Sequence, residues 1–230
     1  MLKIDVLPNE VESAWVDRLS TDEKNRYWRF KSKKKQKSYL FGRTLARHML
    51  NQHFELNCDD WEISPQGRNL VFNAPEEIYI NISHSKEYVT CGISESSIGI
   101  DIEQIRTDRS LMKIAKKYFC PSEYEDLQSI PLDQQIKAFY LLWVIKEAGA
   151  KRGGKSVFYG LSEIQISIKE RNNRFPIISL PNNYVCGYYL HYEDYVIAVS
   201  LNNKVQLQSQ LALFNGKDIV PGPSFVMKEI

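Results

Sequence analysis

The chain has 230 residues, of which 43% are hydrophobic and 25% are charged, and these values exclude the disordered and collagen-like classes. Thirty Lys and Arg residues against 28 Asp and Glu residues give a net charge of +2, which excludes a protein whose whole surface binds nucleic acid. Any anion-binding region must therefore be local.

The N-terminal region and the cysteines indicate a cellular location. Asp5 and Glu10 interrupt the apolar stretch that a signal peptide needs, and no later run approaches the roughly 20 apolar residues of a membrane helix. The four cysteines show no C-x-x-C spacing. We therefore expect a cytoplasmic protein with reduced cysteines and no role at a membrane.

The first predicted element is an amphipathic helix from Lys33 to Asn51. The apolar residues that recur at helical spacing are Phe41, Leu45, Met49 and Leu50. Arg43 and Arg47 lie one turn apart on another face. A basic run surrounds the start of this helix and comprises Arg26, Arg29, Lys31, Lys33, Lys34, Lys35 and Lys37.

A turn at Pro65-Gln-Gly67 precedes the first strands, and helices and strands then follow in the same order again. The predicted strands of the first half are Ile78–Ile82, Tyr88–Ile93 and Ile98–Glu103. The predicted helices of the second half are Leu111–Tyr118, Glu123–Leu127 and Gln134–Lys151, and its strands are Leu161–Ile168, Tyr184–Tyr192 and Tyr195–Leu201. This order predicts an α+β fold of two similar α/β halves.

A short internal repeat supports the two halves. The spacing of His84, Glu87, Tyr88 and Val89 recurs in His191, Asp194, Tyr195 and Val196. We expect an N-terminal half over residues 1–105 and a C-terminal half over 106–201. Residues 202–230, which include Pro221 and Pro223, are expected to form an irregular tail.

The segment from Ile98 to Glu103 alternates isoleucines with glycine and two carboxylates. Side chains of a strand point to opposite faces in turn, so the isoleucines should enter the core while Asp101 and Glu103 project together from the other face. Residues two apart lie roughly 6.6 Å apart along a strand, and carboxylates at that separation suit Mg²⁺. The alternative is an edge strand with a solvated outer face.

The helix predicted from Gln134 to Lys151 has an apolar stripe that ends in a carboxylate. The stripe consists of Ile136, Phe139, Tyr140 and Trp143. At 3.6 residues per turn, Glu147 falls on the same stripe. Because burying an unpaired charge is costly, we expect Glu147 to meet a cation, hydrogen-bond donors or a metal ion. The alternative is a partly exposed ion pair with Lys151.

Polar residues also cluster between Asn81 and Ser85, where one predicted strand ends and a turn leads to the next. Such a position suits an anionic ligand, and His84 could hydrogen-bond a phosphate; the alternative is a solvated histidine. The stretch Gly153-Gly154-Lys155 lacks the full P-loop pattern, so we expect it to end the preceding helix.

Three short blocks follow one another at characteristic separations. They are Asn81-Ile-Ser-His-Ser85, Gly99-Ile-Asp-Ile-Glu103 and Trp143-Val-Ile-Lys-Glu-Ala148. Together they resemble the signature of the 4′-phosphopantetheinyl transferases, in the monomeric surfactin-synthetase-activator (Sfp) type. The resemblance spans roughly residues 15 to 200. It implies two halves related by pseudo-two-fold symmetry, with coenzyme A bound by the first half and the metal by the second.

The resemblance also implies roles for matching residues. Asp101 and Glu103 match Mg²⁺ ligands, and Glu147 matches a third metal-contacting carboxylate. Ser83 and His84 match residues that hold the 3′-phosphate of coenzyme A. These five residues are therefore our expected metal and coenzyme ligands.

Two further matches depart from the family pattern. Arg68 follows Gly67 where the family often has Gly-Lys-Pro, so a cation is kept but the proline is missing. An arginine expected in the first helix falls on Ser38, and whether Arg43, Arg47 or a lysine replaces it is left open.

The implied reaction joins a serine of an apo acyl- or peptidyl-carrier protein to the β-phosphate of coenzyme A and releases adenosine 3′,5′-bisphosphate. Mg²⁺, or Mn²⁺ as an alternative, would neutralise the pyrophosphate. Lys151 matches a catalytic lysine at the pyrophosphate, and Glu147 would take the serine proton. Whether Lys146 faces ligand or solvent is left open.

The basic run is either a solvated helix face or a surface that attracts coenzyme A and an acidic carrier protein. Two other functions compete with the transferase. One is a carrier-binding protein without turnover, which the intact set of carboxylates and Lys151 argues against. The other is a nucleic-acid binder, which leaves the three blocks unexplained, and we expect no nucleic-acid partner.

Overall fold

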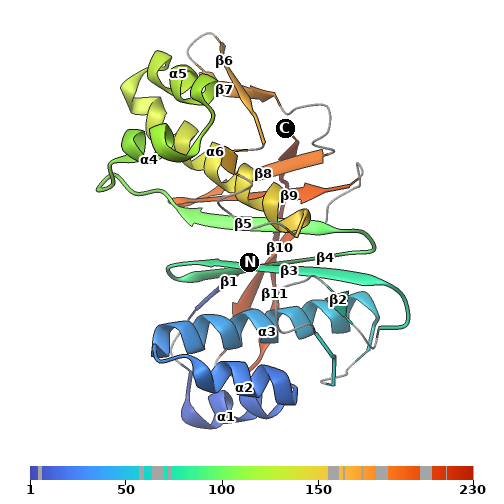
Figure 1. The fold of residues 1–230 in the computed structure, drawn as a ribbon. Coiled ribbons are helices and arrows are strands. Elements are labelled where there is room, and N and C mark those ends of the chain that lie inside the picture. The colour runs from blue at the N-terminus through green and yellow to red at the C-terminus, as the bar shows by residue number, and fades with distance from the viewer. Residues whose placement is uncertain are drawn as a thin grey trace. The chain divides into compact units, whose positions relative to one another are not determined.

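The computed structural model divides the chain into two units (Figure 1). The first comprises Met1–Ile98 with Leu207–Val226, and the second comprises Gly99–Gln206 with Met227–Ile230. The structure describes residues 1–4, 7–56, 60–63, 70–71, 74–154, 161–162, 164–171, 174–179, 186–202, 209–215 and 217–229. Among these, no helix has the length and apolar character needed to cross a membrane.

Three helices open the first unit: α1 (Asn9–Asp17), α2 (Thr21–Arg29) and α3 (Lys33–His53). The helix predicted from Lys33 is confirmed as α3. No pattern above predicts α1 or α2, although a capping box marks the start of α2. Ser20 Oγ accepts a hydrogen bond from Glu23 N, and the Glu23 carboxylate accepts one from Ser20 N.

A sheet in the order β11-β10-β1-β4-β3-β2 completes the first unit. Its strands are β1 (Leu2–Lys3), β2 (Leu70–Val71), β3 (Ile78–Ser85), β4 (Tyr88–Ser94), β10 (Ser209–Phe214) and β11 (Ile219–Phe225). The strands predicted from Ile78 and Tyr88 are confirmed as β3 and β4. α3 packs on both of them. Gly42 permits this close approach, because an added Cβ would lie 2.9 Å from Ile82 Cγ2.

The second unit begins with β5 (Ile98–Gln104), α4 (Leu111–Tyr118), α5 (Pro121–Ser129) and α6 (Leu132–Arg152), which confirm the predicted strand and three helices. Its main sheet has the order β12-β8-β9-β5, with β8 (Cys186–Tyr192), β9 (Tyr195–Leu201) and β12 (Lys228–Glu229). β6 (Ser167–Arg171) and β7 (Arg174–Ser179) form a separate two-stranded sheet.

Two predictions about extended segments are wrong. The strand predicted over Leu161–Ile168 begins only at Ser167. Before it, residues 161–162 are helical, and the carbonyl groups of Leu161 and Ile164 accept hydrogen bonds from Lys146 Nζ. The expected irregular tail contains β10, β11 and β12. Its partner strands lie far away in sequence, as in the pairing of Leu2 with Ala212. The prolines lie on β11 at the end of the strand order, where a missing N–H is tolerated.

The two units repeat one topology, which confirms the predicted similarity of the halves. In each unit a strand (β1 or β5) is followed by three helices and later by a hairpin (β3–β4 or β8–β9). The first strand lies beside the second strand of the hairpin, and the long third helix packs on the hairpin. Both hairpin turns begin with a residue of positive φ, Lys86 at 51° and Glu193 at 52°, as tight two-residue turns require.

The internal sequence repeat has a structural counterpart at the same place in both units. Ile4 N, after β1, donates a hydrogen bond to Glu87 O at 2.5 Å, and Ile105 N, after β5, donates one to Asp194 O at 2.7 Å. Glu87 and Asp194 are equivalent positions of the repeat. The repeated residues therefore mark equivalent hairpin turns.

Each unit has its own hydrophobic core. In the first unit Trp15 packs edge-to-face against Phe41, with ring centroids 5.3 Å apart. In the second unit Phe119 stacks on Phe139 at 5.3 Å, and Phe139 stacks on Trp143 at 5.8 Å. The apolar stripe predicted on α6 is thus part of the core of the second unit.

Candidate active site

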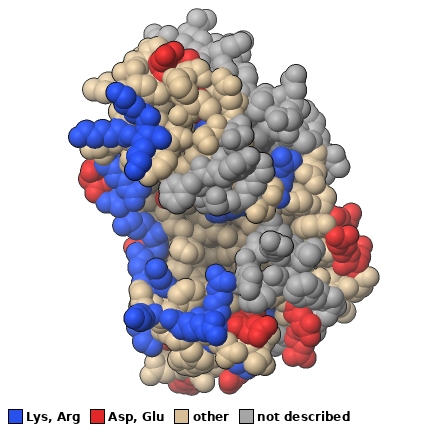
Figure 2. Space-filling view, in the orientation of Figure 1, with Lys and Arg blue, Asp and Glu red and all other residues tan. Residues whose placement is uncertain are grey.

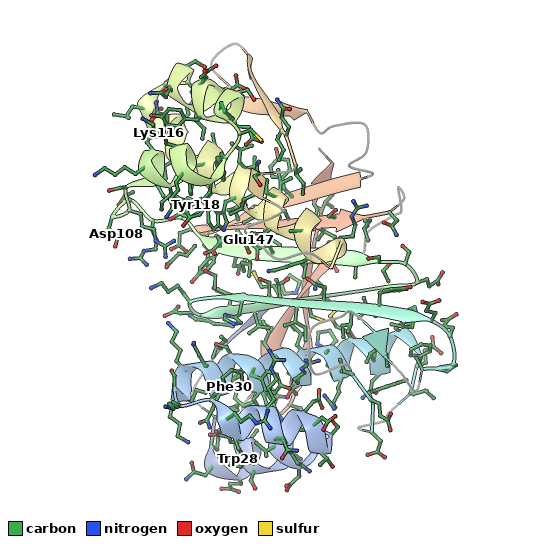
Figure 3. The ribbon with its side chains drawn as sticks, in the orientation of Figure 1. Trp28, Phe30, Asp108, Lys116, Tyr118 and Glu147 are labelled. Atoms are coloured by element: carbon green, nitrogen blue, oxygen red, sulfur yellow. The ribbon has the colours of Figure 1, made fainter. Side chains whose placement is uncertain are left out.

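Three carboxylates of the second unit converge. Asp101 and Glu103 lie on β5, and Glu147 lies on α6, where Figure 3 labels it. Each offers an oxygen, and these oxygens all lie within 4.8 Å of one another. Asp101 is only 2% exposed, so its face of β5 is covered and is not the solvated outer face of the alternative prediction.

Gly99 explains how β5 and α6 bring these carboxylates together. A Cβ at this position would lie 1.9 Å from Ala148 O and 2.6 Å from Arg152 N. Residues two apart share one face of a strand, so Gly99, Asp101 and Glu103 all face α6. The missing side chain lets the strand backbone meet the helix backbone, and the two carboxylates that follow it reach Glu147.

Lys151 completes the cluster. Its Nζ lies 2.6 Å from Asp101 Oδ1 and 3.8 Å from Glu147 Oε2, and it donates a hydrogen bond to Ile100 O at 3.3 Å. The ion pair between Lys151 and Glu147 therefore exists, but Asp101 is the closer partner of the lysine. The side chain of Lys151 is 23% exposed, so the ammonium group keeps some contact with solvent.

The crowding of charges changes the acidity of two groups. Burial, and then the neighbouring carboxylate of Asp101, raise the pKa of Glu147 to about 8. Burial lowers the pKa of Lys151, but Asp101 and Glu147 more than offset this, and the net pKa of Lys151 is raised. Without a bound cation the cluster therefore holds a proton near neutral pH, which is the behaviour expected where carboxylates compete for one positive charge.

The donor set fits a small divalent ion. All three side chains offer oxygen atoms, which hard cations such as Mg²⁺ and Mn²⁺ prefer. Oxygens bound to one octahedral Mg²⁺ lie about 3 to 4 Å apart, and those of the cluster are within 4.8 Å of one another. Burial and the neighbouring carboxylate of Asp101, which raise the pKa of Glu147, also favour the binding of a cation beside it.

The residues expected at the phosphates of coenzyme A belong to the first unit. Ser83 and His84 lie on β3, which extends beyond its predicted end at Ile82 as far as Ser85. Ser83 is buried, whereas His84 is exposed. Because neighbouring strand residues point to opposite faces, the two side chains do not lie on one face. Arg68 lies outside the described residues.

The two halves of the chain match descriptions of one family. Residues 8–96 match the model described as 4′-phosphopantetheinyl transferase, N-terminal, and residues 97–200 match that of the 4′-phosphopantetheinyl transferase superfamily. The 4′-phosphopantetheinyl transferase Sfp of Bacillus subtilis (strain 168) is 30% identical over 189 residues, which cover 81% of this chain and 82% of that protein. This chain belongs to the 4′-phosphopantetheinyl transferase family.

Two further proteins show similarity to this phosphopantetheinyl transferase. The 4′-phosphopantetheinyl transferase psf-1 of Bacillus pumilus is 34% identical over 133 residues, which cover 57% of this chain and 56% of that protein. A solved structure of a holo-(acyl-carrier-protein) synthase from Bacillus anthracis str. Ames, in complex with CoA (3′,5′-ADP), is 19% identical. The matched region covers 47% of this chain and 96% of the synthase chain, with a TM-score of 0.37. Membership of the family confirms that the protein is a transferase.

Lys146 of the transferase faces neither ligand nor solvent. Its side chain is fully buried, and its Nζ lies 2.7 Å from Glu123 Oε2. No sequence pattern above identifies Glu123 as the partner of Lys146; this residue begins the helix predicted over Glu123–Leu127. The only local signal is the spacing Cys120-x-x-Glu123, in which Cys120 N donates a hydrogen bond to Glu123 Oε2. A cysteine is not among the residues of the usual capping pattern.

The arginines of α3 in the transferase bind an internal partner. Arg47 Nη2 lies 2.6 Å from Glu23 Oε2, and Arg43 Nε lies 3.4 Å from Glu23 Oε1. All three residues are buried. Ser38, at the position of the expected arginine, is buried too, and its hydroxyl donates to Lys34 O. The lysines of the basic run are therefore the better candidates to contact an anion.

The basic run of the transferase is a surface feature. Figure 2 shows Lys and Arg side chains gathered where α2 ends and α3 begins. The exposed members are Arg26, Arg29, Lys31, Lys33, Lys34 and Lys35. Trp28, labelled in Figure 3, lies on the same helix, α2, and is 63% exposed.

Proposed function

We propose that this protein transfers 4′-phosphopantetheine from coenzyme A to a serine of an apo acyl- or peptidyl-carrier protein. The observation that carries the proposal is the convergence of Asp101, Glu103 and Glu147 beside the ammonium group of Lys151. Carboxylates that can hold a divalent ion, next to a fixed cation, suit a reaction at a pyrophosphate. Membership of the phosphopantetheinyl transferase family supports the same reaction.

The proposed reaction moves one phosphoryl group. The serine oxygen forms a bond to the phosphorus atom that carries pantetheine, and the bond from this phosphorus to the bridging pyrophosphate oxygen breaks. Adenosine 3′,5′-bisphosphate leaves with the bonding electrons, and the serine proton passes to Glu147. Glu147 is proposed as the base because it is the carboxylate that α6 contributes to the cluster, and a carboxylate held in position can accept a proton in the transition state.

Asp101, Glu103 and Glu147 are the proposed Mg²⁺ ligands, and Mn²⁺ is an alternative because both ions prefer carboxylate oxygens. When bound, the ion supplies charge that stabilises the pyrophosphate oxygens as the leaving group departs. Lys151 is proposed to bind the same phosphate oxygens, and the position of its ammonium group beside Asp101 and Glu147 supports this role. It contributes a positive charge that needs no reorganisation during the reaction.

Coenzyme A is the proposed donor substrate, and its phosphates are proposed to contact Ser83, His84 and Arg68. The exposure of His84 at the end of β3 supports this role, because an accessible imidazole can donate a hydrogen bond to a phosphate. The basic run offers a second region for an anionic partner. We further propose that the protein acts as a monomer in the cytoplasm.

Intact-protein mass spectrometry tests the proposal. The protein is mixed with coenzyme A, Mg²⁺ and a panel of apo carrier proteins, each with a matched variant whose acceptor serine is alanine. We expect a mass increase of one phosphopantetheine on at least one carrier and none on its alanine variant. Binding without any mass increase would support a non-catalytic carrier-binding protein instead, and neither binding nor addition would contradict both functions.

A further inference from the structure

A buried ion pair lies one residue away from Glu147. Lys146 on α6 and Glu123 on α5 are both 0% exposed, and Lys146 Nζ lies 2.7 Å from Glu123 Oε2. The same Nζ donates hydrogen bonds to Leu161 O and Ile164 O, each at 2.6 Å. The ammonium group of Lys146 therefore has three acceptors for its three protons.

The carboxylate of Glu123 is fixed just as firmly. Its Oε2 accepts a hydrogen bond from Cys120 N at 2.9 Å, and its Oε1 accepts one from Ile166 N at 2.7 Å. Cys120 is the N-cap residue of α5, and Ile166 is the residue before β6. The ion pair thus ties α6 to the backbone of two other segments.

Such a pair fixes geometry more than it adds stability. The free-energy cost of removing two charges from water is close in size to the electrostatic attraction between them. An apolar pair of similar volume therefore often gives a protein of equal stability. Apolar contacts have little directionality, however. The hydrogen bonds of Lys146 are directional and fix the position of this residue relative to Glu123, Leu161 and Ile164.

Lys146 lies on the side of α6 that faces away from β5. At about 100° per residue, it is about 200° around the helix from Ala148, whose carbonyl oxygen meets β5 at Gly99. The packing of α6 on β9 and the backbone contact at Gly99 hold the helix on the side of the sheet. The anchored ammonium group on the opposite side of α6 adds a directional restraint against rotation of the helix about its axis.

A small roll would disturb the acidic cluster. Rotating α6 by about 20° would move an atom about 6 Å from the helix axis by about 2 Å. Metal–ligand distances are held within about 0.2 Å of their normal values, and the oxygens of Asp101, Glu103 and Glu147 lie within 4.8 Å of one another. The roll would therefore remove Glu147 from the set of ligands.

A row of aromatic contacts also connects the ion pair to Glu147. Lys146 Nζ lies 5.2 Å from the ring centroid of Phe119, and the centroids of Phe119 and Trp143 are 6.2 Å apart. The side chain of Trp143 in turn hydrogen-bonds that of Glu147. Movement of the ammonium group would therefore reach the carboxylate through packed side chains as well as through the helix.

We propose that Lys146 and Glu123 are positioning residues, which hold α6 at the rotation that brings Glu147 to Asp101 and Glu103. The inference rests on the proposed function, in which these three carboxylates hold a divalent ion. Neither Lys146 nor Glu123 contacts the ion or a substrate. Their effect is on how well the site is preorganised for the ion.

The test measures metal binding directly, without turnover. Mn²⁺ is titrated into the full-length protein, and free Mn²⁺ is followed by electron paramagnetic resonance, with urea unfolding measured in parallel. We expect Lys146→Met to weaken Mn²⁺ binding about tenfold or more, as for other residues that orient metal ligands. The double variant Lys146→Met/Glu123→Gln should recover stability, because no unpaired buried charge remains, yet it should still bind Mn²⁺ weakly.

Two controls separate positioning from stability and from the metal site itself. Glu23→Gln removes a buried carboxylate at the equivalent helix position of the first unit, so it should lower stability without changing Mn²⁺ binding. Asp101→Asn should abolish Mn²⁺ binding. The positioning role is overturned if the double variant binds Mn²⁺ within about twofold of the unaltered protein while Asp101→Asn does not bind. If Asp101→Asn binds normally, the metal site and the proposed function both fail.

Discussion

Glu147 lies at the point where the apolar stripe of α6 meets the acidic residues of β5. Its position one turn beyond Trp143 buries it, and the carboxylates of Asp101 and Glu103 add negative charge around it. Lys151 supplies a positive charge close to Asp101 and Glu147. A carboxylate in this environment has a strong tendency to bind a proton or a cation. A group that activates a hydroxyl has to accept its proton.

Glu147→Gln tests the role of this carboxylate in turnover. We expect kcat to fall by about 10²- to 10⁴-fold at saturating Mg²⁺, because the serine proton loses its acceptor. The rate is measured as phosphopantetheine addition to a carrier protein, and circular dichroism checks that the variant is folded. Full turnover at saturating Mg²⁺ would contradict the role of Glu147 as base.

The contribution of Glu147 to the stability of the metal-free protein should fall as the pH rises from about 5 to about 8. Folded Glu147 keeps its proton up to a pKa of about 8, whereas the unfolded group loses it near its ordinary value of 4.5. Between these values the folded state binds more protons than the unfolded state, so a rise in pH lowers the free energy of unfolding. Urea denaturation in the presence of a chelator measures the slope.

The matched control for this pH dependence is again Glu147→Gln, which cannot titrate at this position. Its free energy of unfolding should vary less steeply over the same pH range, because the other titrating groups are unchanged. Equal slopes for the two proteins would contradict the raised pKa of Glu147. Added Mg²⁺ should also stabilise the unaltered protein more strongly at the higher pH, since a metal ligand must be deprotonated.

At the scale of elements, the site depends on how closely α6 approaches β5. Gly99 is the point of contact, because its missing side chain leaves room for the backbone of α6. The same device occurs in the first unit, where Gly42 of α3 packs near Ile82 of β3. The neighbours differ, however: Gly99 faces backbone atoms, and Gly42 faces side-chain atoms.

Gly99→Ala should therefore be far more disruptive than Gly42→Ala. The new methyl group of the first variant would lie 1.9 Å from Ala148 O, so the whole helix must move. We expect the free energy of unfolding to fall by about 3 kcal/mol or more, at the upper end for overpacking. In Gly42→Ala the contact at 2.9 Å is with Ile82 Cγ2, a side-chain methyl group, so only a side chain and not a helix backbone has to shift. Urea denaturation of both variants checks the order, and an equal loss would contradict it.

At the scale of the whole molecule, a net charge of +2 conceals strong local differences. Lysines and arginines are exposed at the end of α2 and the start of α3. The negatively charged side chains of Asp101, Glu103 and Glu147 cluster where β5 meets α6. Exposed cations attract anions over distances of about 10 Å at an ionic strength of 0.1 M. Asp101 is buried and Glu103 and Glu147 are partly buried, so dissolved salt screens the acidic cluster less than it screens the exposed cations.

Neutralising the basic run tests its role in substrate binding. Replacing Lys33, Lys34, Lys35 and Lys37 with glutamine should raise the KM for coenzyme A or for the carrier protein at low ionic strength. The difference should shrink as salt is added, because exposed charges are screened. Kinetics with each substrate over a series of salt concentrations check this. Unchanged KM values for both substrates at low salt would mean that these lysines are only a solvated helix face.

Patterns within one element were predictable because they depend on local geometry. The alternation from Ile98 to Glu103 identified a strand and placed Asp101 and Glu103 on one face of it. Helical spacing placed Glu147 on the buried stripe of α6. In this way the sequence by itself determined the main elements, the family and three carboxylates that the structure brings together.

Contacts between elements were decided only by the tertiary structure. The capping pattern could have located α2, but nothing near Lys146 indicates that its partner is Glu123, and nothing near Ala212 indicates that it pairs with Leu2. Periodicity tells which face of an element is apolar, but not which other element covers it. The covering of Asp101 by α6 depends on the backbone contact at Gly99, which follows from the packing of two elements that are far apart in the sequence.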